Sequence, residues 1–414
     1  MPKTYHLVTL GCPKNQVDSD KLEGTMTADG MRAVDDAADA DVVVVNTCAF
    51  IEEARAESID TILDLSGRNP DAELVVTGCL AERSGPELAE ALPEVDRVAG
   101  FGVPVTLSSR AERTPEFDLL RLARPASSRP WAYVKIAEGC DRACGFCAIP
   151  SFRGPQRSRP ISEIVAEVDA LGAREIVLVA QDLAAYGRDQ GHGTRDIVPL
   201  VGAVAERVDW VRLLYLYPSD LDDTLIDAVL ATGVPYFDLS LQHVSRPLLR
   251  AMRRWGDGER FLGRIADIRS QAPDAVFRSN FIVGYPGETE ADHDALLAFV
   301  EAASLDWCGF FTYSREAGTH ADGLDDHVAA ELARERHREL TELQDGITAR
   351  KRDEMIGRRV RVLVDEQGVA RSTAEAPEID GIIAVPESLA TGQFHDVDIV
   401  GAEGPDLTAS EAAP

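Results

Sequence analysis

The sequence predicts an α/β protein with three parts: an N-terminal domain built on a parallel sheet, a βα barrel that is complete or partial, and a small C-terminal β domain. Through most of the chain, apolar runs alternate with helix-like stretches, which is typical of parallel strands covered by helices. From Gly357 onward only short β-like runs remain. A length of 414 residues also exceeds one ordinary hydrophobic core. We therefore expect domains at residues 1–118, 126–356 and 357–405.

The N-terminal domain is predicted from three strand–helix units. Its apolar runs are YHLVTL, ADVVVVNT and ELVVTG, and the second is followed by the helix-like stretch EEARAESIDTILDL. Each run ends beside a cysteine, namely Cys12, Cys48 and Cys79. Because open parallel sheets bind ligands beyond the carboxyl ends of their strands, these cysteines are expected to converge at one edge of one sheet. A linker rich in Pro, Ser and Arg follows at about residues 107–130.

Six further apolar runs, separated by helix-like stretches such as ISEIVAEVDALG, predict the βα barrel. The runs are AYVKIAEG, EIVLVAQD, VRLLYLYP, YFDLSLQH, VFRSNFIVG and CGFFTYS. A charged helical stretch at residues 328–355 closes this part of the chain. We interpret its charges as a solvated face rather than an arm that binds nucleic acid.

The C-terminal domain is predicted from the runs RRVRVLVDE, IDGIIAVP and VDIVGAE. The last ten or so residues are expected to be disordered. Residues 358–414 contain 4 arginines and 11 acidic residues. Because phosphate contacts dominate RNA binding, so acidic a domain is better suited to a basic protein partner.

The whole chain is strongly acidic, with 42 Lys and Arg against 71 Asp and Glu, which gives a formal net charge of −29. Such a field repels nucleic acid at long range, although acidity can also simply keep a protein soluble. The first residues lack the apolar core of a secretory signal, and no uncharged apolar run approaches the ~20 residues that span a bilayer. We therefore expect a cytoplasmic protein without a membrane partner, whose reduced cysteines are available to bind metal.

The cysteines of the run EGCDRACGFC carry the strongest functional signal. Cys140, Cys144 and Cys147 are spaced Cys-x-x-x-Cys-x-x-Cys after a predicted strand. Three thiolates on a short loop can hold a 4Fe–4S cluster and leave its fourth iron open. An open iron can bind S-adenosylmethionine through its amino and carboxylate groups, and one electron then releases a 5′-deoxyadenosyl radical. The alternative is a structural zinc loop, which needs a fourth ligand that the nearby sequence lacks.

Together, these features resemble the methylthiotransferases among the radical S-adenosylmethionine enzymes, over about residues 3–402. The resemblance is carried by the compact cysteine spacing with Phe146 before its last cysteine, by the preceding cysteine trio and by the final β domain. It implies an N-terminal cluster domain, a radical S-adenosylmethionine barrel and a small β-barrel called a TRAM domain. It also implies a second 4Fe–4S cluster on Cys12, Cys48 and Cys79, whose open iron binds an exogenous sulfur species. The alternative interpretation of that trio is three buried cysteines that act only as small apolar residues.

Four motifs are similar to those of the protein-modifying branch of this family: GCPKNQVDSD, VNTCAFIEEARAESID, EGCDRACGFCAIPSFRG and APEIDG. The tRNA-modifying relatives usually carry motifs like GCQMN and GCDNFCTFCIVPYTRG. The resemblance therefore implies methylthio transfer to the β-carbon of an aspartate in small-subunit ribosomal protein twelve, an unactivated position that radical chemistry can reach. Implied partners are that protein, an electron donor such as flavodoxin or ferredoxin, and a sulfur donor. The alternatives are a tRNA adenosine methylthiotransferase and a non-catalytic iron–sulfur carrier.

Three other residues are candidates for cofactor binding. Gln181 and Asp182 end a predicted strand at the rim where βα barrels place their functional groups. They are expected to contact S-adenosylmethionine or the substrate, and a loop cap is the alternative. Phe146 joins them through the resemblance. No residue is singled out as catalytic.

The remaining polar and cysteine features are interpreted structurally. Gln242 and His243 end another predicted strand, and the histidine is interpreted as a hydrogen-bonding residue. The run from Gly284 to Gly287 is a turn, and Cys308 is a core residue. The loop arginines are interpreted as solvated, although they could hold a carboxylate: Arg153, Arg157 and Arg159.

Overall fold

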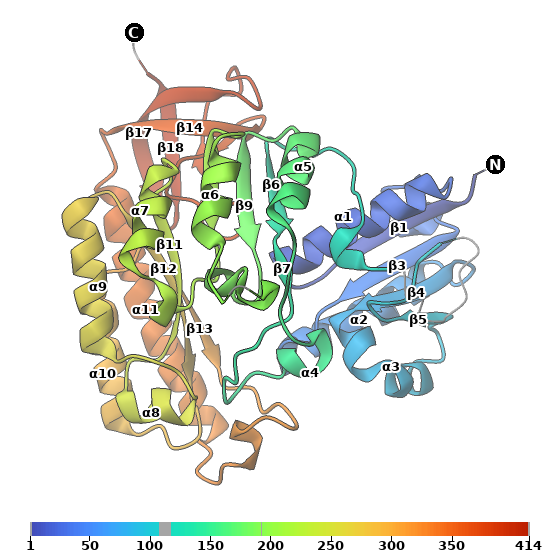
Figure 1. Ribbon diagram of the computed structural model, residues 1–414, viewed down its shortest axis with the longest axis horizontal. Helices are drawn as coiled ribbons and strands as arrows, with labels where there is room; N and C mark the ends of the chain where they lie inside the picture. Colours follow the sequence, from blue (N-terminus) through green and yellow to red (C-terminus); the bar gives the residue numbers. More distant parts are fainter. Residues whose placement is uncertain (1, 107–116, 192, 413–414) are drawn as a thin grey trace.

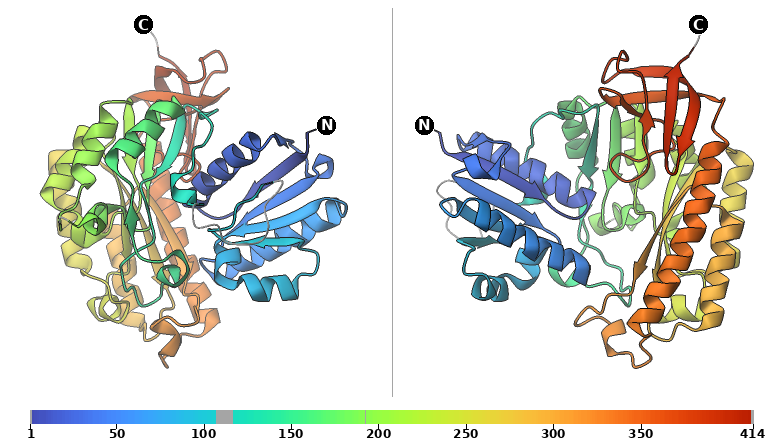
Figure 2. Two further views of the ribbon diagram at one scale, coloured as in Figure 1. Left: turned by 45° about the vertical axis from the view of Figure 1, so that its right-hand side comes forward. Right: turned by 180° about the vertical axis from the view of Figure 1, so that it is seen from behind.

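We describe the fold from a computed structural model that covers residues 2–106, 117–191 and 193–412. Figure 1 shows an N-terminal α/β domain in blue, a larger βα domain from green to orange, and a small β domain in red. Figure 2 shows that the N-terminal domain lies beside the larger domain, whereas the small β domain lies at one end of it. The predicted α/β class with three parts is confirmed.

The N-terminal domain contains a five-stranded parallel sheet in the order β2–β1–β3–β4–β5. The strands are β1 (Thr4–Thr9), β2 (Arg32–Ala33), β3 (Val42–Thr47), β4 (Glu73–Gly78) and β5 (Arg97–Ala99). Helices α1 (Pro13–Ala28), α2 (Glu52–Arg68) and α3 (Cys79–Ala91) connect them. Every residue of central β3 is buried, because four consecutive valines suit a strand that is covered on both faces. The three predicted strands are confirmed.

Six parallel strands form the larger domain, at the six predicted runs. They are β6 (Trp131–Lys135), β9 (Glu175–Val179), β10 (Trp210–Leu213), β11 (Tyr236–Gln242), β12 (Val276–Val283) and β13 (Trp307–Thr312). They pair as β10–β9–β6 and β11–β12–β13, and a parallel bridge between Leu216 and Leu239 joins the two sheets. In the part of the chain that the structure describes, β6 and β13 do not pair. The barrel is therefore partial, one of the two predicted forms.

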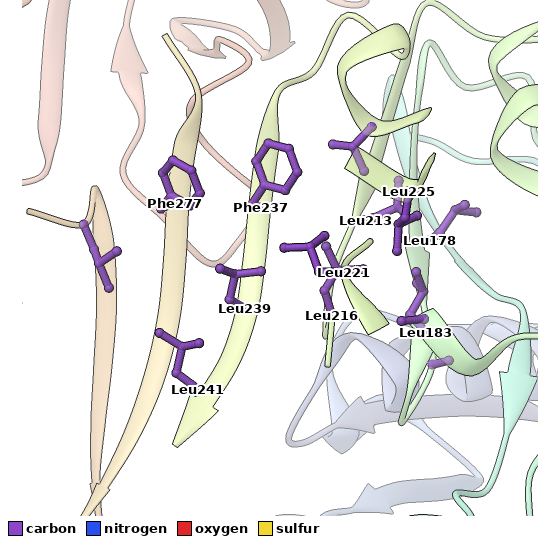
Figure 3. Packing of buried hydrophobic residues seen from close by; sticks show 14 of the residues in the cluster. Leu178, Leu183, Leu213, Leu216, Leu221, Leu225, Phe237, Leu239, Leu241 and Phe277 are labelled. Carbon is purple, nitrogen blue, oxygen red and sulfur yellow. The ribbon is translucent and has the colours of Figure 1, made fainter. Parts of the chain in front are cut away.

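Helices cover the outside of the partial barrel (Figure 1). They are α5 (Ile161–Leu171), α6 (Ile197–Ala205), α7 (Asp223–Ala231), α8 (Arg246–Ala251), α9 (Gly258–Gln271), α10 (Glu290–Ala303) and α11 (Ala330–Asp353). Between them and the strands lies the main core, in which the Phe237 and Phe277 rings of adjacent strands stack with centroids 5.5 Å apart (Figure 3). Shorter elements are α4 (Ile149–Arg153), β7 (Ala137–Glu138), β8 (Arg157–Ser158) and six 3-10 helices: Ala37–Asp39, Leu119–Arg121, Leu183–Ala185, Arg188–Gln190, Pro218–Asp220 and Ala321–Gly323.

The C-terminal domain is a closed barrel with the strand order β14–β15–β16–β18–β17. Its strands are β14 (Arg359–Glu366), β15 (Val369–Arg371), β16 (Ile383–Ala384), β17 (Phe394–Glu403) and β18 (Asp406–Glu411). The expected small β-barrel is confirmed. The prediction of disorder in the last ten or so residues is wrong for Asp406–Glu411, because β18 pairs with both β16 and β17 and buries Leu407 and Ala409.

The solvated face predicted for residues 328–355 is also only partly correct. Helix α11 packs against β13 and α10, and it buries charged Arg336 and Arg352 as well as apolar side chains. Of the predicted linker, residues 107–116 lie outside the described residues, and Leu119 and Leu120 are buried. No helix in the described ranges is both long and apolar enough to cross a bilayer.

Buried charges join the C-terminal domain to the partial barrel. The Glu175 carboxylate, at the start of β9, is fully buried and accepts hydrogen bonds from Arg212 at 2.9 Å and Arg371 at 2.8 Å. The C-terminal domain also sends Asp380 into the barrel, where it accepts a hydrogen bond from the Tyr236 hydroxyl at 2.6 Å and lies 3.5 Å from Arg278. Burial raises the pKa of Asp380 to about 6, although Arg278 lowers it.

Because the pKa of Asp380 is raised, the free energy of unfolding is expected to depend on pH. The folded protein holds this proton more tightly than the unfolded chain, so the contribution of Asp380 to stability is lost as the pH rises from about 4 to about 6. Relative to the wild type, Asp380→Asn should therefore gain on the order of 2 kcal/mol between pH 4 and pH 7. Urea unfolding at a series of pH values would measure this difference. Asp396→Asn, at an exposed position of the same domain, is the matched control.

Candidate active site

A cavity of about 510 Å³ lies where the N-terminal domain meets the carboxyl ends of the barrel strands. Six of the seven cysteines line it, as do the three other candidates from the sequence: Cys12, Cys48, Cys79, Cys140, Cys144, Cys147, Phe146, Gln181 and Asp182. Ile379 of the C-terminal domain also reaches this cavity. The fold thus brings residues from all three domains to one place.

The N-terminal trio lies at the carboxyl edge of the five-stranded sheet. Cys12 is the N-cap of α1, Cys48 follows β3, and Cys79 is the first residue of α3. The cysteines approach so closely that a Cβ on Gly11 would lie 2.9 Å from the Cys48 sulfur. Gly11 also has φ of +95°, which other residues rarely adopt. The predicted convergence at one sheet edge is confirmed.

Nearby positive charges offset the effect of burial on the thiol pKa values of this trio, but not equally for each cysteine. Burial raises the pKa of Cys48 to about 11. Burial also raises the pKa of Cys12, but Lys14 and Arg153 outweigh it, and the net pKa is lowered. The Arg153 guanidinium donates a hydrogen bond to the Cys79 sulfur at 3.0 Å. The site is therefore electrostatically prepared to hold at least one thiolate.

The compact trio lies on the loop that follows β7. The amide of Arg142 donates to the Cys140 sulfur at 3.4 Å, and the Arg254 guanidinium donates to the Cys144 sulfur at 3.4 Å. Burial raises the pKa of Cys140 to about 11 and that of Cys147 to about 12. A thiol with so high a pKa becomes a thiolate at neutral pH only when a bound cation stabilises it, as a metal centre does.

Two of the residues predicted to bind a cofactor, Gln181 and Asp182, each have a buried oxygen without a hydrogen-bond partner beside the compact trio. The Gln181 amide donates to Glu138 at 2.9 Å, while its buried Oε1 has no partner. One oxygen of Asp182 accepts from the Arg142 Nε at 2.5 Å, while its buried Oδ1 has no partner. The Phe146 ring packs against the barrel core and adds an apolar wall. Buried acceptors without partners are costly, so these two oxygens are suited to accept hydrogen bonds from a bound group.

A buried charge cluster that was not predicted from the sequence connects the two trios. The Glu138 carboxylate, beside the compact trio, accepts from Lys135 at 2.7 Å and from Arg153 at 2.8 and 2.9 Å. Arg153 also donates to Asn15 in α1 at 2.8 Å, and Lys135 donates to Asp18 in the same helix. We call Asp18, Lys135, Glu138 and Arg153 the bridging cluster.

The interpretation of the three loop arginines as solvated is correct only for Arg157, whose side chain is half exposed. Arg153 and Arg159 are buried: Arg153 lies between Glu138 and the distant Asp18, and Arg159 pairs with Glu167. No local pattern announces such pairing. Only the short spacing from Cys147 to Arg153 hinted that the arginine lies near a trio.

A second group of charges joins the N-terminal domain to the segment that follows β13. The Glu316 carboxylate, after β13, accepts from Arg55 of α2 at 2.7 Å and from Arg83 of α3 at 2.7 Å. Ser314 adds a hydrogen bond to the same carboxylate and accepts one from the amide of Glu52. Glu316 is only 2% exposed and also lines the cavity. The N-terminal domain is thus attached to both edges of the open barrel.

The residues interpreted structurally behave largely as expected. His243 is buried and accepts a hydrogen bond from the Ser245 amide at 3.0 Å, although its neighbour Gln242 lines the cavity. Gly284 and Gly287 both have positive φ in the turn after β12, as expected for a turn. Cys308 packs against the barrel core.

Within the described residues, no three His, Cys, Asp or Glu side chains are arranged to hold a single metal ion. A 4Fe–4S cluster is bound differently, since each thiolate binds a separate iron and the sulfurs remain farther apart.

Comparisons with known proteins identify relatives over nearly the whole chain. Residues 4–100 match the Uncharacterized protein family UPF0004, residues 134–300 the Radical SAM superfamily, and residues 356–411 the TRAM domain. The ribosomal protein uS12 methylthiotransferase RimO of Cutibacterium acnes is 41% identical, over 99% of this chain and 98% of its own length. Its counterpart in Sorangium cellulosum is 43% identical, over 92% of this chain and 84% of its own length. Among solved structures, the cobalamin-dependent S-adenosylmethionine radical enzyme OxsB is 12% identical, covers 83% of this chain and 56% of its own, and has a TM-score of 0.46.

Proposed function

Because the chain belongs to the ribosomal protein uS12 methylthiotransferase RimO family of radical S-adenosylmethionine enzymes, we propose that it transfers a methylthio group to the β-carbon of an aspartate in ribosomal protein uS12. The observation that carries this proposal is that both cysteine trios line one cavity. Hydrogen removal and sulfur transfer act on the same carbon atom. A shared cavity lets both occur without moving the substrate to another site.

The two trios fit two iron–sulfur clusters. Cys140, Cys144 and Cys147 would hold the 4Fe–4S cluster that binds S-adenosylmethionine, and Cys12, Cys48 and Cys79 would hold a second one. An arginine donates to one sulfur of each trio, which offsets the negative charge that thiolates bring into a buried site. When bound, these groups supply the carbon radical and the methylated sulfur on which the transfer depends.

The side chains around the two trios would bind and orient S-adenosylmethionine. The free oxygens of Gln181 and Asp182 can accept hydrogen bonds from amino or hydroxyl groups of S-adenosylmethionine. Arg142 holds the Asp182 carboxylate in place through its other oxygen. The cavity wall contains Phe50, Phe146 and Ile149. Such apolar walls exclude water, which protects a reactive radical from side reactions.

The C-terminal domain favours a basic protein as substrate over RNA. On its surface, the exposed acidic residues outnumber the exposed arginines: Glu366, Glu378, Glu387, Asp396, Glu403, Asp406 and Glu411 against Arg358, Arg359 and Arg361. RNA binding needs the opposite balance, whereas a ribosomal protein rich in Lys and Arg is complementary. On this proposal the protein acts in the cytoplasm, where ribosomal proteins are found. Its further partners would be an electron donor, such as flavodoxin or ferredoxin, and a sulfur donor.

Reconstitution would test this function directly. The protein is loaded anaerobically with iron and sulfide, then mixed with S-adenosylmethionine, reductant, a sulfide donor and either a peptide that covers the uS12 aspartate or bulk tRNA. We expect 5′-deoxyadenosine together with a methylthio mass increase on the aspartate of the peptide. A mass increase on tRNA alone would instead favour the adenosine-modifying alternative, and clusters without 5′-deoxyadenosine would favour an iron–sulfur carrier.

A further inference from the structure

Among the described residues that line the cavity, one cation has neither a carboxylate partner nor a hydrogen bond. Lys14 lies in the first turn of α1, is only 8% exposed and lines the cavity two residues after Cys12. Its ammonium nitrogen lies 3.3 Å from the centre of the Tyr215 ring. Across residues 2–106, 117–191 and 193–412, no carboxylate lies within 4.0 Å of this nitrogen, and it makes no hydrogen bond. The residue is therefore largely removed from water, and an aromatic face only partly replaces the hydration that an ammonium loses.

The other cations of the cavity are already engaged. Arg142 pairs with Asp182 and Asp220, and Arg278 pairs with Asp238. Arg153 belongs to the bridging cluster. Arg254 lacks a carboxylate too, but it donates to the Ser240 carbonyl and to the Cys144 sulfur. Lys14 is therefore the cavity cation whose donors are still available, and an ammonium has three of them.

The backbone of Tyr215 provides a second, independent observation. This residue follows β10 and has a φ of +65°, a left-handed conformation that is strained for a bulky side chain. Its amide is held by a 2.9 Å hydrogen bond to the Asp238 carboxylate. Gln242, at the end of β11, has a φ of +74° and lines the same cavity. Strain of this kind gathers at functional sites, and here it places an aromatic ring under the Lys14 ammonium.

We propose that the Lys14 ammonium binds the side-chain carboxylate of the substrate aspartate and so selects aspartate over uncharged residues. This inference rests on the proposed function. In aspartate the carboxylate is bonded directly to the β-carbon, so anchoring the carboxylate fixes the reacting carbon between the two trios. The contact is a charge-assisted hydrogen bond in which no covalent bond changes and Lys14 keeps its protons.

A different role for Lys14 would be to offset the charge of the neighbouring Cys12 thiolate. The two roles have different consequences. A lysine that only balances charge affects the iron content and spectrum of the N-terminal site, and it treats all peptides alike. A lysine that binds substrate changes the preference between an aspartate and an asparagine peptide.

Peptide binding to the reconstituted full-length protein would test the inference. The probes are two fluorescein-labelled peptides that cover the uS12 aspartate, one with aspartate and one with asparagine at that position. Their affinities are measured by anaerobic fluorescence anisotropy with S-adenosylmethionine but without reductant. We expect the wild type to prefer the aspartate peptide by about tenfold or more, because a charge-assisted hydrogen bond contributes that much.

The variants are chosen to separate charge from shape. Lys14→Met keeps the length of the side chain, and we expect it to bring the preference to within about twofold of unity. Lys14→Arg should keep most of the preference. Lys3→Met, at a half-exposed lysine that pairs with Glu73, should behave as the wild type. Iron content is measured in every variant, and the preference is compared among proteins that hold both clusters.

An unchanged preference in Lys14→Met, or an equal loss for both peptides, would overturn the role of Lys14 while leaving the proposed function intact. Loss of iron in Lys14→Met with an intact preference would have the same meaning and assign the lysine to the cluster site. Failure of the wild type to bind or modify the aspartate peptide would overturn the proposed function itself, and this inference with it.

Discussion

Cys144→Ala is expected to abolish both 5′-deoxyadenosine formation and methylthio transfer, whereas Cys79→Ala is expected to abolish only the transfer. The reason is that the two residues belong to different trios on one cavity. Removing one of three thiolates leaves a cluster with too few protein ligands, so each variant loses one centre. With the compact trio intact, Cys79→Ala keeps the site that cleaves S-adenosylmethionine. It lacks only the site that would present sulfur.

The measurement combines iron analysis with two product assays on the reconstituted proteins. Each variant should hold about four irons, where the wild type holds about eight. Cys308→Ala is the matched control, because Cys308 packs against the barrel core and does not line the cavity. It should keep the full iron content and both products. Normal methylthio transfer by Cys79→Ala would contradict the assignment of a second cluster.

The strands of the two parallel parts could be predicted because burial on both faces leaves continuous apolar runs. The runs at β3 and β9 are examples, since all of their residues are buried. Strands β2 and β15 have only two or three residues and leave no such pattern, whereas β16 lies within the predicted run IDGIIAVP. Strand β18 alternates exposed polar residues with buried Leu407 and Ala409, and its acidic, terminal position looked disordered. Its order comes from pairing with β17, which is a tertiary effect.

The cysteines of the candidate site could be predicted, because ligand spacing and strand ends are local features. The charges around them could not. Helix α1 buries Lys14, Asp18 and Lys21, although its sequence resembles that of a solvated helix. Lys135 lies 117 residues from its partner Asp18, and Arg153 lies 138 residues from Asn15. Charges are buried only when opposite charges meet them, and no local pattern reveals such partners.

The bridging cluster leads to the second large prediction, because its charges balance one another. Asp18 and Glu138 face Lys135 and Arg153, all of them buried. Burial raises the pKa of Glu138, but Arg153 and Lys135 outweigh it, and the net pKa is lowered. Glu138 is therefore ionised in the folded protein at neutral pH. Its contribution to stability is fully present above about pH 4.3, the ordinary pKa of glutamate, and is lost as the pH falls through the lowered pKa.

Glu138→Gln is accordingly expected to destabilise the protein by about 3–5 kcal/mol at pH 7, because two buried cations are left with one carboxylate. Urea unfolding measures this loss, and the loss should shrink at acidic pH. Glu163→Gln is the matched control, since the Glu163 side chain is 41% exposed and lies 3.9 Å from exposed Arg121. It should cost less than about 0.5 kcal/mol. Equal losses in the two variants would show that the bridging cluster does not stabilise the junction of the domains.

The double variant Glu138→Gln/Arg153→Gln distinguishes lost charge balance from lost packing. Removing one cation along with the carboxylate restores neutrality around Lys135 and Asp18, so part of the stability should return. Methylthio transfer should be absent from the double variant, because the Arg153 hydrogen bond to the Cys79 sulfur is lost. 5′-Deoxyadenosine formation without transfer is therefore expected in the double variant. Recovery of both stability and transfer would mean that Arg153 serves only to neutralise Glu138, and that the N-terminal trio does not depend on its contact.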